Sequence, residues 1–199
     1  MVLNAALVVA SYLIGTFPTA ILVGRQTGHD PTSEGSGNPG ASNVYRTSGR
    51  WAGAIVAIGD VVKGALPAAA GSLIGGRAVG FACWVAAVVG HILPATRRFR
   101  GGKGVATAGG GALVLLPLVA AFCGAGFAIA VKWSKRVSVG SIVMFVLGPI
   151  LTAAFGRPAW EVAVATAVSA LVLLRHAGNI RRLAGGTEPG LDTPGDASS

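Results

Sequence analysis

Three polar segments interrupt an otherwise apolar chain, and each carries residue types that can bind or transfer a charged group. The first, residues 35–46 (GSGNPGASNVYR), combines glycines with short polar side chains and ends at an arginine. Glycines let several backbone N–H groups turn toward one ligand, which is how many anion-binding loops are built. The segment therefore predicts an anion-binding loop, although an ordinary turn-rich loop has the same composition.

The second segment, residues 91–107 (HILPATRRFRGGKGVAT), places one lysine among glycines just before an apolar stretch. A helix N terminus offers free N–H groups and the positive end of the helix dipole, so this pattern predicts a phosphate site around Lys103. The spacing is not that of a Walker A loop, which has a Gly, four residues and then Gly-Lys-Ser/Thr. Arg97, Arg98 and Arg100 are more typical of membrane anchoring on the cytoplasmic side.

The third segment, residues 175–188 (RHAGNIRRLAGGTE), contains His176 and Asn179 three positions apart, which makes them neighbours on one helix. An imidazole can accept or donate a proton near neutral pH, so His176 is a candidate general base. Arginines also stabilise the negative end of a helix, and we favour this structural role for Arg175 and Arg181.

The elements that must position these segments are membrane helices. Of the 199 residues, 52% are hydrophobic and only 12% are charged, whereas a soluble domain is about a quarter charged. Uncharged runs close to or beyond the length that crosses a bilayer occupy residues 1–24, 78–96, 104–131 and 137–156. This composition excludes a soluble nucleic-acid-binding protein despite the net charge of +9.

Two further spans contain charge: residues 51–76 carry Asp60 and Lys63, and residues 158–174 carry Glu161. The spacing of Asp60 and Lys63 predicts an ion pair on one helix face, with a catalytic role as the alternative. The run 104–131 is interrupted by glycines and Pro117, and its length fits either one tilted helix or two short ones.

The charge distribution decides between these two arrangements, because Lys and Arg accumulate on cytoplasmic loops. If the run 104–131 crosses twice, thirteen Lys and Arg residues share one side and two lie opposite, whereas a single crossing gives 8 against 7. We therefore predict an all-α integral membrane bundle of seven transmembrane helices, some short or broken. The N terminus is outside, the C terminus and all three polar segments are cytoplasmic, residues 1–184 form the membrane domain, and residues 185–199 form a flexible tail.

The three segments, in this order, strongly resemble the bacterial acyl-phosphate:glycerol-3-phosphate acyltransferases, the PlsY family. DVVKG at residues 60–64 and VSVGSI at residues 137–142 support the resemblance, which covers nearly the whole chain. It implies a small inner-membrane enzyme of phospholipid synthesis that moves a fatty acyl group from acyl phosphate to the 1-hydroxyl of glycerol 3-phosphate, forming lysophosphatidic acid and phosphate. Membrane lipids surround the enzyme, and no metal, cofactor, nucleic acid or protein partner is implied.

The resemblance also implies which residues contact the substrates. Catalytic roles fall to His176, Asn179, Lys103 and Ser36. Substrate-binding roles fall to Arg46, Ser141, Asn38, Asn43, Gly37, Gly40, Gly101, Gly102, Gly104 and Arg182. His176 could be the general base, or a donor phosphate oxygen could take the proton while His176 orients the acceptor. We favour the second mechanism, because the sequence places no carboxylate plainly beside this histidine.

Three other functions compete with this interpretation. Thr32, Ser33 and Ala177 replace basic residues that are common in the family, so a related enzyme with a changed acceptor is one alternative. A small anion transporter is another, but it predicts charge throughout the spans, where the sequence has essentially three charged residues. An acyl-CoA-dependent acyltransferase usually has His followed five residues later by Asp, and no histidine here has that partner.

Overall fold

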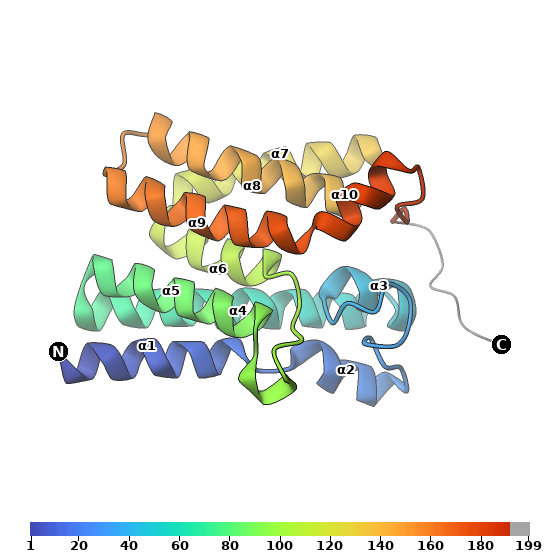
Figure 1. Ribbon diagram of the computed structural model, residues 1–199, viewed down its shortest axis with the longest axis horizontal. Coiled ribbons are helices and arrows are strands. Elements are labelled where there is room, and N and C mark those ends of the chain that lie inside the picture. Colours follow the sequence, from blue (N-terminus) through green and yellow to red (C-terminus); the bar gives the residue numbers. More distant parts are fainter. Residues whose placement is uncertain (192–199) are drawn as a thin grey trace. The chain divides into compact units, whose positions relative to one another are not determined.

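The computed structural model describes residues 1–191, and every regular element among them is helical (Figure 1). Contacts within the chain define two compact units, residues 1–111 and residues 112–191. The α-helices are α1 (Val2–Gly15), α2 (Thr19–Thr27), α3 (Ala41–Ser48), α4 (Arg50–Gly75), α5 (Arg77–Ile92), α6 (Val105–Leu115), α7 (Pro117–Ser134), α8 (Val137–Ala154), α9 (Ala159–Arg175) and α10 (Ala177–Ala184). A short 3-10 helix, η1 (Ala95–Arg97), lies between α5 and α6.

In the first unit, α1, α4 and α5 lie side by side, and α2 and α3 pack on the same α4 (Figure 1). Glycines let these helices approach closely, because there is no room for a methyl group at Gly15 against the Ala87 backbone or at Gly90 against the Tyr12 backbone. Small residues at helix contacts are typical of membrane proteins, where close van der Waals packing replaces the hydrophobic driving force. The first unit is therefore a tightly packed scaffold for the two polar loops that it carries.

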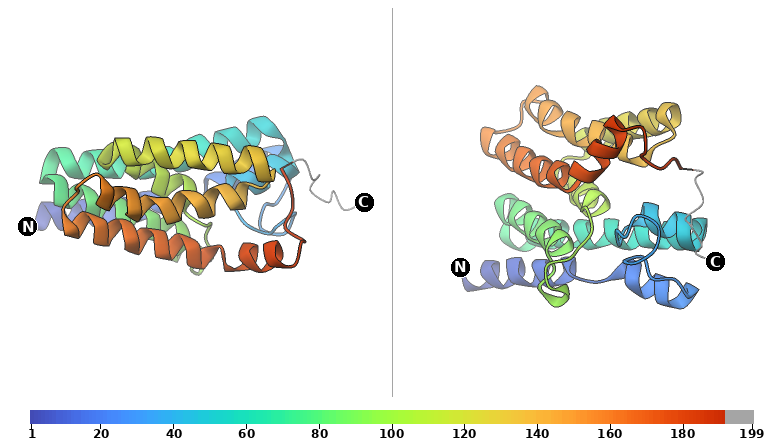
Figure 2. Two further views of the ribbon diagram at one scale, coloured as in Figure 1. Left: turned by 90° about the horizontal axis from the view of Figure 1, so that it is seen from above. Right: turned by 45° about the vertical axis from the view of Figure 1, so that its right-hand side comes forward.

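In the second unit, α8 packs against both α7 and α9, and α10 continues from α9 after a bend of 56° (Figure 2). Glu161, whose presence in a span the sequence predicted, is 1% exposed and pairs with Arg157 at 2.8 Å. The pair lies at the end of α9 opposite to His176, so it is part of the scaffold.

Among residues 1–191, five helical segments are long and apolar enough to cross a membrane: Val2–Thr27, which comprises α1 and α2, Arg50–Gly75, Arg77–Arg97, which comprises α5 and η1, Pro117–Ser134 and Val137–Ala154. The bent pair α9 and α10 would make a sixth. These helices confirm an all-α membrane protein, while the count of seven and the orientation of the termini stay predictions. The remaining apolar helix, α6, has 11 residues, about 16 Å at helical rise, against a hydrocarbon core of about 30 Å.

The run 104–131 forms two helices, as predicted, and only one of the interruptions seen in its sequence breaks it. The break falls at Leu116, whose φ is −137°, immediately before Pro117, and the glycines at 109–111 and 124–126 lie inside helices. Proline has no N–H to donate and moves the preceding residue out of the helical region. A single proline therefore breaks this run, and the glycines do not.

The first residues of the predicted flexible tail contact α8. Glu188 is 8% exposed, and the Leu191 N–H donates to the Lys135 carbonyl at 2.7 Å, so residues 185–191 return to the start of α8. The boundary after residue 184 between a membrane domain and a flexible tail stays a prediction. The rest of the predicted tail, residues 192–199, lies outside the described residues.

Candidate functional site

The loop that precedes α3 is organised around the side chain of Asn43, which is 1% exposed. Its Oδ1 accepts hydrogen bonds from the Ser36 N–H at 2.8 Å and from the Ser36 hydroxyl at 3.1 Å, while its Nδ2 donates to the carbonyls of Pro31 and Glu34, both at 3.0 Å. An amide side chain offers two donors and an acceptor oxygen with two lone pairs, so these four bonds use its full capacity. Asn43, which was predicted to bind substrate, therefore orients the exposed Ser36.

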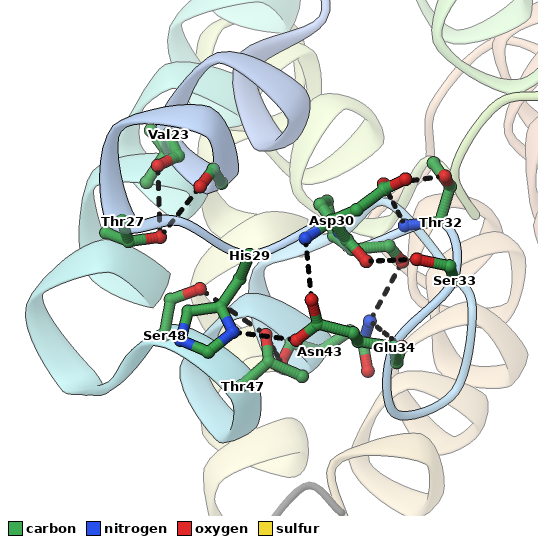
Figure 3. A network of polar contacts seen from close by, with 12 residues as sticks. Val23, Thr27, His29, Asp30, Thr32, Ser33, Glu34, Asn43, Thr47 and Ser48 are labelled. Carbon is green, nitrogen blue, oxygen red and sulfur yellow. Dashed lines mark hydrogen bonds and ion pairs between the residues drawn. The ribbon is translucent and has the colours of Figure 1, made fainter. Parts of the chain in front are cut away.

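The start of the same loop is an acidic network (Figure 3). Glu34 accepts from His29 Nδ1 at 2.7 Å and from the Asp30 N–H at 2.9 Å, and Asp30 accepts from the N–H and the hydroxyl of Thr32 at 2.9 and 2.6 Å. The Thr32 hydroxyl bond is the main cause that lowers the pKa of Asp30, and the Asp30 N–H followed by His29 lowers the pKa of Glu34. Thr32, where the family commonly has a basic residue, thus holds Asp30 through hydrogen bonds.

Around Asn43 the loop supplies the other predicted binding residues. Gly37 has a φ of 65°, a left-handed conformation that favours glycine, and the Gly40 N–H donates to the Asn38 carbonyl at 2.8 Å in a tight turn before α3. Arg46 lies one turn after Asn43 on α3 and is half-buried. The exposed Ser36 and the guanidinium of Arg46 are thus carried by one short, hydrogen-bonded segment.

The second segment lies across the C-terminal end of α5. The Gly102 N–H donates to the His91 carbonyl at 3.2 Å, a methyl group on Gly101 would collide with the carbonyls of His91 and Ile92, and one on Gly102 would collide with the His91 ring. Gly104 has a φ of 83°, immediately before α6 begins. These three glycines are therefore required by backbone packing. They hold the half-buried Lys103 at the N terminus of α6.

In the second unit, His176 lies at the bend between α9 and α10 and is 2% exposed. Its Nδ1 is 2.8 Å from the Val172 carbonyl oxygen. A carbonyl oxygen can only accept, so Nδ1 carries the proton and, in the neutral ring, Nε2 carries the lone pair. The sequence predicted one continuous helix through His176, whereas α9 ends at Arg175 and the histidine is the joint.

Asn179, 5% exposed, is fixed by a residue that the sequence analysis assigned to the tail. Its Nδ2 donates to Glu188 Oε1 at 2.6 Å, Arg182 Nε donates to Glu188 Oε2 at 2.8 Å, and Arg136 Nε donates to the Glu188 carbonyl at 3.1 Å. Burial raises the pKa of Glu188, but the hydrogen bonds, led by that of Asn179, outweigh it and keep the pKa below its ordinary value. The only sequence signal for this role was one acidic residue at the end of a basic segment.

Ser141, the remaining predicted contact, lies in the first turns of α8 and is 2% exposed. Its hydroxyl donates to the Val137 carbonyl at 3.1 Å, one turn earlier. Because the hydroxyl proton is used in this bond, the oxygen can only accept a hydrogen bond from a further partner. Among residues 1–191, no three His, Cys, Asp or Glu side chains come together in a way that could hold a metal ion.

Comparison with known proteins gives this arrangement a family. The family model described as glycerol-3-phosphate acyltransferase matches residues 5–186. The chain belongs to this family. Relatives named glycerol-3-phosphate acyltransferase include one from Thioalkalivibrio sulfidiphilus, 40% identical over 95% of this chain and 94% of that protein, and one from Syntrophotalea carbinolica, 44% identical over 92% and 94%.

Two solved structures share the fold of this glycerol-3-phosphate acyltransferase family member. Both are crystal structures of PlsY (YgiH), described as an integral membrane glycerol 3-phosphate acyltransferase, one in the glycerol 3-phosphate form and one in the lysophosphatidic acid form. They are 33% identical to this chain, with TM-scores of 0.90 and 0.88, and the match covers 94% of each chain.

Within this family member, each unit contains its own part of the predicted residues. The first unit carries Ser36 on the loop before α3, Arg46 on α3 and Lys103 on the loop before α6. The second unit holds His176, Asn179 and Ser141 at the ends of α8, α9 and α10. Asn43 fixes Ser36, and Glu188 fixes Asn179. Of these two residues, only Asn43 was named as a site residue from the sequence.

Proposed function

We propose that the protein transfers a fatty acyl group from acyl phosphate to the 1-hydroxyl of glycerol 3-phosphate and releases lysophosphatidic acid and inorganic phosphate. The observation that carries the proposal is the match over 94% of the chain to PlsY in its glycerol 3-phosphate form. The lysophosphatidic acid form of that protein carries the product of the proposed reaction, which supports the same acceptor.

The donor is an activated mixed anhydride, so the enzyme needs to position two substrates and stabilise charge. The glycerol oxygen forms a bond with the acyl carbon, the bond from that carbon to the phosphate oxygen breaks, and phosphate leaves with both electrons. Lys103 and Arg46 supply positive charge to the substrate phosphates, Arg as a fork and Lys as a point charge. The remaining proposed contacts come from backbone N–H groups and from three side chains. The N–H groups lie near Gly37, Gly40, Gly101, Gly102 and Gly104, and the side chains are those of Asn38, Ser141 and Arg182.

The hydroxyl proton goes to an oxygen of the donor phosphate in the mechanism that we favour. His176 Nδ1 donates to a neutral carbonyl, which stabilises an imidazolium less than a carboxylate would. In this mechanism Nε2 of His176 accepts a hydrogen bond from the acceptor hydroxyl, and Asn179 and Ser36 hold the substrates in line. General-base catalysis by His176 is the competing mechanism, and a pH profile separates the two.

The proposed site operates at the cytoplasmic face of the bacterial inner membrane. The thirteen-to-two distribution of Lys and Arg supports seven crossings, with α6 and α7 each crossing once and the N terminus outside. In cells, a cysteine introduced as Ser33→Cys should be protected from an impermeant thiol reagent, and one introduced as Arg77→Cys should react. Cys83 and Cys123 are both buried, and replacing them by Ser in the same strain removes background labelling. The opposite labelling pattern would reverse the proposed orientation.

Phosphate release from palmitoyl phosphate by the protein purified in lipid nanodiscs tests the activity itself. We expect release to depend on glycerol 3-phosphate and to saturate with it. Release that is independent of the acceptor would indicate hydrolysis, and no release would contradict the proposed function.

A further inference from the structure

Four polar residues that have no role in the reaction above are buried together in the first unit, and we call them the His91 cluster: Asp60, Lys63, His91 and Thr107. Their exposed fractions are 3, 6, 5 and 0%. They come from α4, α5 and α6, so the cluster joins three helices in the apolar interior of the first unit.

The cluster is linked by short polar contacts. Lys63 Nζ lies 2.8 Å from Asp60 Oδ1 and donates to the Phe17 carbonyl at 3.1 Å. His91 Nδ1 lies 3.1 Å from the Thr107 hydroxyl and 3.9 Å from Asp60 Oδ1. The predicted ion pair of Asp60 and Lys63 is thus confirmed, and it continues through His91 to the first turn of α6.

The other side of the His91 ring faces the glycine-rich loop. A methyl group on Gly102 would collide with His91 Nε2, and the Gly102 N–H donates to the His91 carbonyl. Gly102, which precedes Lys103, therefore packs directly against the imidazole. Thr107, which bonds the ring, is itself fixed because Gly64 of α4 leaves no room between the two backbones.

Arg97 is the most buried of the three arginines that precede the glycine-rich loop. It is half-buried and interacts electrostatically with Asp60 and Lys63, whereas Arg98 and Arg100 are exposed. One carboxylate is thus surrounded by two cations and an imidazole under the loop. Replacing such a buried ionic cluster by apolar groups is often neutral or stabilising, so stability alone is a weak reason for it.

We propose that the His91 cluster positions residues 101–104, and with them Lys103, for the phosphate of a substrate. The Thr107 hydroxyl fixes the orientation of the imidazole, the imidazole supports Gly102, and Asp60, which is paired with Lys63, lies on the Nδ1 side of the ring. These are positioning residues, since none of them contacts substrate. The inference rests on the proposed function, in which Lys103 binds a substrate phosphate.

The test compares Thr107→Val, which removes the hydroxyl at nearly constant shape, with Thr107→Ser, which keeps it. Lys103→Arg serves as the reference, because it keeps the charge but moves it, and the KM that it raises identifies the substrate that Lys103 binds. We expect Thr107→Val to raise the KM of that same substrate about 5- to 30-fold, the effect of losing one or two buried hydrogen bonds. The other KM should stay within about twofold, and Thr107→Ser should remain within about threefold of the wild type in both.

Several results would overturn the inference. The cluster would be purely structural if Thr107→Val left both KM values unchanged or raised both together. The same conclusion would follow if the variant lowered only the thermal stability. If neither KM responds to Lys103→Arg, the loop does not bind phosphate and the inference falls with it. If Thr107→Val does not fold, His91→Asn, which can keep the bond to Thr107 but loses the ring under Gly102, must show the same selective rise. A wild type without acyl transfer would refute the proposed function and the inference together, whereas an active wild type with unchanged variants refutes only the inference.

Discussion

Glu188→Gln is the substitution whose effect follows most directly from the geometry. The side chain keeps its shape but loses its charge, and its new NH₂ group must face either the NH₂ group of Asn179 or the guanidinium of Arg182, which both donate to Glu188 in the wild type. A hydrogen bond to a charged group contributes about 1.5–3 kcal/mol. The Arg182 side chain is 41% exposed, so solvent screens part of its contribution. We expect the free energy of unfolding to fall by about 2–3 kcal/mol and catalytic efficiency to fall because Asn179 loses its fixed orientation.

The pH dependence of this difference provides the assay. Because the pKa of Glu188 is lower in the folded than in the unfolded protein, its stabilising effect is present above its ordinary pKa of 4.5 and is lost as the pH falls through the folded value. Thermal unfolding in detergent should show a constant gap between wild type and Glu188→Gln from about pH 6 to 8 that narrows in acid. Arg181→Gln, at an exposed neighbouring position, is the matched control and should behave as the wild type. Unfolding of Glu188→Gln at the wild-type temperature at pH 7, or a gap that widens in acid, would refute this reasoning.

Four further substitutions test the proposed contacts, and Arg98→Ala serves as a control. Lys103→Ala and Arg46→Ala should each lower kcat/KM about a hundredfold, equivalent to about 3 kcal/mol of charge-assisted contact. Arg98 is exposed, so Arg98→Ala should change kcat/KM little. Near-normal kinetics in both Lys103→Ala and Arg46→Ala would remove the anion-binding argument. Asn43→Asp keeps the acceptor for Ser36 but loses both donors to the Pro31 and Glu34 carbonyls, so its kcat should fall at least tenfold at pH 8. It should recover partly at pH 6, where a protonated acid can donate again. A pH profile of kcat parallel to that of the wild type would contradict this. His176→Asn should keep the shape of the pH profile of kcat while the KM of glycerol 3-phosphate rises, and loss of an ascending limb with unchanged binding would instead identify His176 as the base.

Much of the fold could be predicted because it depends on local quantities. The length of uncharged runs indicates membrane helices, and the i, i+3 spacing of Asp60 and Lys63 indicated the ion pair found at 2.8 Å. The two-helix structure of residues 104–131 followed from charge counting. The position of its break did not, because glycines 109–111 are accommodated within α6, whereas Leu116, immediately before Pro117, leaves the helical conformation. The presence of a proline does not fix a break by itself, since Pro67 and Pro149 lie inside α4 and α8.

The site was harder to predict, since its decisive contacts join residues that are distant in sequence. Turn-forming residues indicated an anion-binding loop, but nothing in the composition shows that the Asn43 amide is fully used by Pro31, Glu34 and Ser36. Glu188 is buried only because the chain after α10 returns to Arg136, 52 residues earlier. The resemblance assigned Gly101 and Gly102 to substrate binding, and the sequence alone did not show that their contact with the end of α5 also requires glycine.

A competition between two acyl donors tests the central claim most directly. The protein purified in lipid nanodiscs receives glycerol 3-phosphate together with equal amounts of deuterated palmitoyl phosphate and unlabelled palmitoyl-CoA, and mass spectrometry measures the acyl chain of the lysophosphatidic acid formed. We predict a product that carries deuterium almost exclusively. Unlabelled lysophosphatidic acid as the main product, or no lysophosphatidic acid from a correctly folded preparation, would contradict acyl transfer from acyl phosphate to glycerol 3-phosphate.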